Sequence, residues 1–179
     1  MNVLRSTVWA ALTTGLALIA GTAPTPDLAA PVSRLDHQRQ MQQAEVRQRF
    51  DQAVVMLHAR EYEHAITALD RVLALAPEMP EAHVNLGYAF LGLQRADAAR
   101  SAFLAAIERR PEQANAYYGL AMAEEQRNDL EAALGGMRSY LHLVKGDEPH
   151  RVRARAALWE WEQKLGRHAP KAASAPSGR

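Results

Sequence analysis

The chain has 179 residues, of which 48% are apolar and 23% are charged, and its formal net charge is +1. This composition suits one helical domain, and the mixed charges give no electrostatic reason to expect nucleic acid or anionic lipid as a partner. Cysteine is absent. Disulfides, thiolate metal sites, a cysteine nucleophile and a lipid-modified N-terminal cysteine are therefore excluded.

Residues 1–30 have the order of sections found in an export signal. Arg5 precedes an apolar stretch over residues 8–20, and a segment rich in Gly, Pro, Thr and Ala follows. Extended to residues 6–23, the stretch reaches the lower limit for crossing a bilayer, so an uncleaved inner-membrane anchor is an alternative. We expect a periplasmic protein, exported by a cleaved signal or held at the inner membrane by an uncleaved one. A cytoplasmic protein with an apolar tail is the third reading.

Residues 31–45 are predicted to form a linker and an N-terminal helical extension. Three prolines favour extended backbone over residues 22–32. Ser33 and Asp36 form a weak capping box, so a helix is expected to begin after this linker. The polar residues 37–49 contain no helix breaker and are expected to be a solvated extension of the next helix. A coiled-coil contact with another protein is the alternative.

An interval of 34 residues recurs through the middle of the chain. It separates Ala65, Ala99 and Ala133, and it also separates Pro77 from Pro111. A repeat of this length predicts a helix-turn-helix unit whose apolar face is buried only when successive units stack. The interval divides the chain into three units, which are residues 46–79, 80–113 and 114–147.

The middle unit has the clearest pattern. Its marker residues are Leu86, Gly87, Phe90, Ala99, Phe103, Ala106 and Pro111. This pattern resembles the tetratricopeptide repeat, which has Leu-Gly and an aromatic residue on its first helix and Ala, Phe, Ala and Pro on its second. The resemblance implies an all-α fold, a right-handed superhelical stack of paired helices. Small residues such as Gly87 and Ala99 would allow close approach of the helices.

Several positions depart from the family pattern. Arg49, His83 and Tyr117 stand where the family often has Trp, Glu124 replaces the aromatic residue of the third unit, and Lys145 replaces its closing Pro. Most departures fall in the outer units. Terminal repeats are commonly atypical because they face solvent on one side.

A last helix is predicted over residues 148–166. It has a broad apolar side and a charged side, as a helix that covers the open end of a stack requires. Trp159 and Trp161 are expected to be packing residues. Residues 167–179 are rich in Ala, Ser, Pro and Gly and are predicted to be a disordered tail.

The sequence offers no set of residues for catalysis or for a cofactor. Glu61 and His64 have the spacing of a helical metal-ligand pair, but no second Glu-x-x-His occurs to complete a site. Phosphate-binding loops, nucleophile elbows and His-Glu-x-x-His motifs are also lacking. We therefore expect a protein that is not an enzyme and that holds no metal.

A second apolar stripe follows the first helix of each unit, separate from the core stripe. In the middle unit it consists of Val84, Tyr88 and Leu91. The resemblance implies that these positions line a concave groove, where apolar side chains favour a peptide or a partner helix. Packing against the adjacent helix is the alternative for several of them. The predicted groove residues are Phe50, Val54, Leu57, Val84, Asn85, Tyr88, Leu91, Asn115, Tyr118 and Met122.

Some family members clamp a C-terminal carboxylate with Lys or Arg and Asn in the groove. Only Asn85 corresponds to that set here, so this mode of binding is disfavoured. The sequence predicts a non-catalytic scaffold or assembly factor of the bacterial cell envelope that binds a client protein or peptide segment. An accessory subunit of an envelope enzyme or of c-type cytochrome maturation, and a cytoplasmic assembly factor, are the alternatives.

Overall fold

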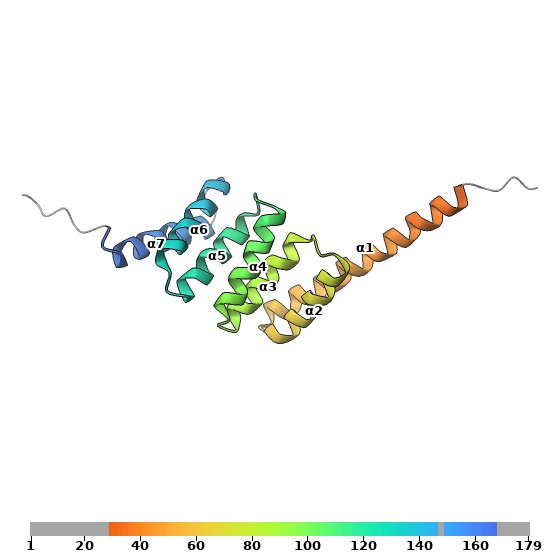
Figure 1. The fold of residues 1–179 in the computed structure, drawn as a ribbon, viewed down its shortest axis with the longest axis horizontal. Helices are drawn as coiled ribbons and strands as arrows, with labels where there is room; N and C mark the ends of the chain where they lie inside the picture. The colour runs from red at the N-terminus through yellow and green to blue at the C-terminus, as the bar shows by residue number, and fades with distance from the viewer. Residues whose placement is uncertain (1–28, 147–148, 168–179) are drawn as a thin grey trace, which may run out of the picture. The chain divides into compact units, whose positions relative to one another are not determined.

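The computed structural model describes residues 29–146 and 149–167 (Figure 1). The chain divides into two units between His37 and Gln38. In the second unit, consecutive helices from α2 to α7 pack side by side (Figure 1). The described helices are α1 Ala29–His58, α2 Tyr62–Leu75, α3 Pro80–Gly92, α4 Ala96–Arg109, α5 Ala114–Gln126, α6 Leu130–Leu143 and α7 Pro149–Lys164.

Helix α1 begins at Ala29, earlier than the sequence indicated. It therefore includes Pro31, which was expected to belong to an extended linker. A proline is tolerated in the first turn because the first backbone N–H groups of a helix have no partner within the helix. Side chains of residues 38–45 are exposed, whereas Val46 and Arg49 are half-buried.

The turn inside each helix pair has the same backbone structure. Arg60, Gln94 and Asn128 are spaced 34 residues apart and have φ values of 62°, 59° and 63°. The N–H of the residue after each donates to the carbonyl oxygen five residues earlier, at 2.9 Å in all three turns. This bond and the left-handed residue form a Schellman motif, which ends the first helix of each pair. The three pairs are therefore structurally equivalent at the predicted interval.

Small residues and one aromatic ring fix the distances between the helices. Ala65, Ala99 and Ala133 are each fully buried. Phe103 of α4 is also fully buried, and its ring lies against the backbones of Gly87 in α3 and Gly119 in α5. A Cβ atom added to Gly87 would be only 2.6 Å from Cε1 of Phe103, and one added to Gly119 would be closer still. Glycine is thus required at both positions for this ring to join two neighbouring pairs.

Glu124 shows how the third unit accommodates a carboxylate at an aromatic position. Its side chain is buried, and the two oxygens accept hydrogen bonds from Arg100 Nε at 2.7 Å and Arg127 Nη1 at 2.6 Å. Arg127 also pairs with Asp97 at 2.7 Å. Hydrogen bonds to Glu124 and then to Asp97 raise the pKa of Arg127 above its usual value. Because Asp97 and Arg100 belong to α4, these ion pairs join the second unit to the third in addition to the Phe103 ring.

Helix α7 packs on the end of the stack through one side. Ala154 and Trp161 are buried in a cluster with Met137 and Tyr140 of α6. The indole N–H of Trp161 donates to Glu125 Oε1 at 2.8 Å. Trp159, by contrast, is 61% exposed, so the expectation that it packs is wrong. Two residues along a helix point to nearly opposite sides, and only one of the two tryptophans can face α6.

We predict that Glu124→Gln lowers the free energy of unfolding by about 1–3 kcal/mol, because a buried group that loses its charged partners is costly. The matched control is Glu131→Gln. Glu131 also pairs with an arginine, Arg167, but its side chain is 56% exposed, and exposed pairs contribute about 0–1 kcal/mol. Urea unfolding of both variants measures the difference. Equal small losses would contradict a buried electrostatic link between α4 and α5.

Candidate binding groove

A hollow of about 340 Å³ lies where the helices of the second and third units meet α7. We call it the C-terminal hollow. It combines three tyrosines with one amide and two basic side chains, drawn from four helices. Its lining residues are Tyr88 of α3, Asn115 and Tyr118 of α5, Tyr140 of α6, and His150 and Arg153 of α7.

Tyr88 belongs both to the packing and to the wall of the hollow. Its hydroxyl donates to the backbone oxygen of Asn115 at 3.1 Å, and its ring meets Phe103 edge-on, with centroids 5.1 Å apart. Burial raises the pKa of Tyr88 above its ordinary value, and the neighbouring Tyr118 and Tyr140 raise it further. The phenol therefore keeps its proton and its role as a donor at neutral pH.

Tyr118 forms the centre of the aromatic surface. Its ring lies edge-on to Tyr140 at 5.2 Å and perpendicular to the His150 ring at 6.3 Å between centroids. His150 and Arg153 are exposed at the edge of the hollow. Arg153 has no hydrogen bond or ion pair within the described part of the chain. Its guanidinium is therefore available to an incoming acidic group.

The structure brings together three of the predicted groove residues, Tyr88, Asn115 and Tyr118. Phe50 lines a different hollow, also of about 340 Å³, between α1 and the segment from Leu75 to Met79. Phe50 is thus separate from the three residues of the C-terminal hollow. The predicted groove residues that remain half-buried and line neither hollow are Val54, Leu57, Asn85, Leu91 and Met122.

Val84 corrects the groove prediction. It is only 5% exposed and belongs to a buried cluster that includes Ala116 of α5. The first helices of the second and third pairs, α3 and α5, contact one another directly. This contact covers Val84 and leaves it in the core, as the alternative reading of the stripe allowed.

Three residues of the C-terminal hollow were not found from the sequence: Tyr140, His150 and Arg153. Tyr140 lies on the second helix of its pair, whereas the search for groove residues followed the first helices. The other two lie on α7, which was interpreted only as a cap. Helix α7 begins 35 residues after α5 begins, close to one repeat interval. That spacing was the available signal that α7 continues the series of first helices.

The described residues hold no group of three or more His, Cys, Asp or Glu side chains placed to bind a metal ion. None of the helices in this part of the chain is long and apolar enough to span a bilayer. The export signal or anchor predicted for residues 1–30 falls almost wholly outside the described residues, as does most of the tail predicted for residues 167–179.

Two overlapping segments, residues 50–114 and 84–148, match the family model of the tetratricopeptide repeat. Together they span more than half of the chain. The protein belongs to the tetratricopeptide repeat (TPR) family. The sequence has no match among curated proteins. The predicted all-α stack of TPR units and the family resemblance are both confirmed.

Solved TPR structures have the same fold. The first TPR of Spaghetti (RPAP3), bound to an HSP90 peptide, is 21% identical with a TM-score of 0.63, over 68% of this chain and 93% of that one. The Yersinia enterocolitica chaperone SycD, in complex with a peptide of the translocator YopD, is 16% identical with a TM-score of 0.63, over 68% and 95%. The Sgt2 TPR domain of Aspergillus fumigatus is 18% identical with a TM-score of 0.63, over 75% and 87%.

Proposed function

We propose that this TPR protein is a non-catalytic scaffold that binds a peptide or helix of a client protein at the C-terminal hollow. The observation that carries the proposal is the convergence of Tyr88, Tyr118, Tyr140, His150 and Arg153 on one open concavity. Two structures with this fold, those of RPAP3 and SycD, each contain a bound peptide. They support a peptide as the kind of ligand, and the residues of the hollow define its chemistry.

The hollow fits a segment in which an apolar side chain neighbours a carboxylate. The half-buried ring of Tyr118, which packs edge-on against the buried Tyr140, offers an apolar surface for the first group. Arg153 and His150 stand beside that surface, and a guanidinium binds a carboxylate with paired hydrogen bonds. The sequence alone indicated no cation in the groove. Arg153 supplies one from α7, at a position that the family pattern did not mark.

We also propose that the protein acts in the bacterial cell envelope. The support is the arrangement of Arg5 and the apolar stretch over residues 8–20, which is that of an export signal. A scaffold in this location would hold client segments during assembly of envelope proteins.

The binding proposal is tested with a photoreactive residue introduced at Asn115, which is exposed in the hollow. We expect it to form a covalent adduct with a defined client in cells. Arg153→Glu should weaken that adduct about 10-fold or more, since a like charge replaces a desolvated ion pair. The matched control is Arg155→Glu, because Arg155 is exposed on the same helix and lines no part of the hollow. Equal yields from both variants, or no adduct, would contradict the proposal.

Location is tested by fractionating cells that express the full chain with a C-terminal tag. We expect the protein in the periplasmic fraction, or in the membrane fraction with its tag open to protease added from the periplasmic side. A tag that stays protected in intact spheroplasts and is recovered with cytoplasmic markers would contradict export. That result would leave the binding proposal in place, because the two rest on different residues.

A further inference from the structure

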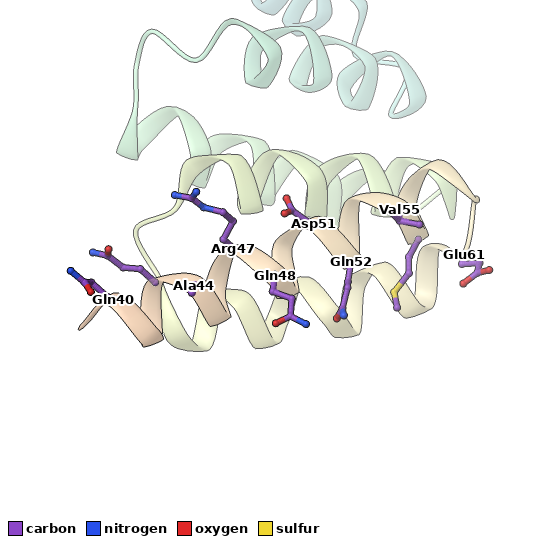
Figure 2. A pocket seen from close by; sticks show the side chains of 10 residues that line it. Gln40, Ala44, Arg47, Gln48, Asp51, Gln52, Val55 and Glu61 are labelled. Carbon is purple, nitrogen blue, oxygen red and sulfur yellow. The ribbon is translucent and has the colours of Figure 1, made fainter. Parts of the chain in front are cut away.

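A third hollow, of about 1090 Å³, follows one side of α1 (Figure 2). We call this side the outer face of α1. Figure 2 shows Arg47, Asp51 and Val55 along one edge of the face and Gln48 and Gln52 along the other. Val55 is 67% exposed, the largest exposure among the large apolar side chains of the described residues. Most of the side chains that line the face are polar, and its apolar residues are Ala44, Val55 and Met56. The face is separate from the C-terminal hollow.

The repeat interval identifies the face of α3 that is equivalent to the outer face of α1, and it shows which helix packs on that face. Gln48, Gln52 and Val55 correspond, 34 residues later, to Ala82, Leu86 and Ala89 of α3, which are buried. The cluster that contains Ala82 and Leu86 also contains Leu69 and Val72 of α2, so the helix of the preceding pair covers them. No preceding helix covers α1 within the described residues. The outer face of α1 thus has the shape that receives a helix, with a more polar surface.

Four residues form the seam of this face, which are Ala44, Gln48, Asp51 and Val55. Their spacings of four, three and four residues are those of a helix that packs along another helix. When the seam of a second copy runs antiparallel to the first, the two seams are complementary. Ala44 then lies opposite Val55 of a second copy, a small side chain against a large one, and Gln48 lies opposite Asp51.

The charges beside the seam show the same complementarity. Arg47 and Asp51 lie on one edge of the face (Figure 2). Neither forms a hydrogen bond or ion pair within the described part of the chain. A two-fold axis that sets two helices antiparallel keeps each edge beside the same edge of the other copy. Arg47 of each copy therefore meets Asp51 of the other, and the ion pair forms twice. A parallel pair would instead place this edge beside the opposite edge, which carries Gln48 and Gln52, and no ion pair would form there.

We propose that two copies of this chain associate through the outer face of α1, with the two α1 helices antiparallel across a two-fold axis. Such an interface uses the same residues from both copies. It shares no residue with the C-terminal hollow. The dimer would therefore present two client sites. This inference does not depend on the proposed client binding.

The test exchanges the two charges in separate variants. Arg47→Glu would place a carboxylate beside Asp51, and Asp51→Arg would place a guanidinium beside Arg47, so each variant should repel its own copies. An equimolar mixture of the two variants should form a heterodimer. In it the introduced carboxylate of one chain meets the introduced guanidinium of the other, and the unchanged Asp51 meets the unchanged Arg47. Sedimentation equilibrium and native mass spectrometry at low salt measure the species, since salt screens exposed pairs.

We expect a wild-type dimer, a dissociation constant raised about 10-fold or more in each single variant, and recovery in the mixture. The matched control is Arg71→Glu, because Arg71 is exposed on α2 and outside the face, and it should dimerise as the wild type does. Circular dichroism checks that each variant is folded. A wild-type chain that stays monomeric, single variants that still dimerise, or a mixture that fails to recover would each overturn the proposal. So would a monomer whose α1 face captures a client helix instead.

Discussion

The ring of Phe103 between two glycines is the constraint on which the rest of this structure depends. It lies against the backbones of Gly87 and Gly119, so it sets the separation of α3 and α5 from α4. That separation is small enough for the hydroxyl of Tyr88 to reach the backbone of Asn115. The wall of the C-terminal hollow is thus a direct consequence of a contact in the core.

Residues at equivalent positions of the repeat differ between units, and these differences fit the surroundings of each unit in the stack. At one such position, Phe90 in the second unit becomes Glu124 in the third, where two arginines satisfy the buried carboxylate. At another, the buried Leu86 of α3 corresponds to Gln52 on the outer face of α1, where no helix covers it in the described chain. The backbone structure of the repeat is the same in each unit. The side chains determine whether a given helix face is buried in the core, contacts the next unit or is exposed to solvent.

Periodicity was sufficient to predict the paired helices, because the interval and the two apolar stripes follow from helical geometry. It also placed Tyr88, Asn115 and Tyr118 on one surface. It could not show that α5 covers Val84, since that depends on the distance between successive pairs rather than on the face of one helix. The left-handed turns at Arg60, Gln94 and Asn128 were missed because none of them is glycine. Helix α7 contributes His150 and Arg153 to the hollow because it packs on α6, and the pattern of one helix does not show which helix it packs on.

The most direct test of the account is the stability of two glycine variants measured together. Gly119→Ala should lower the free energy of unfolding by about 1–3 kcal/mol, because its methyl group would overlap the Phe103 ring. Gly135→Ala, in α6 with nothing near an added Cβ, should raise it by about 0.5–1 kcal/mol through helix propensity. If Gly119→Ala is as stable as Gly135→Ala, Phe103 does not join the two units as described.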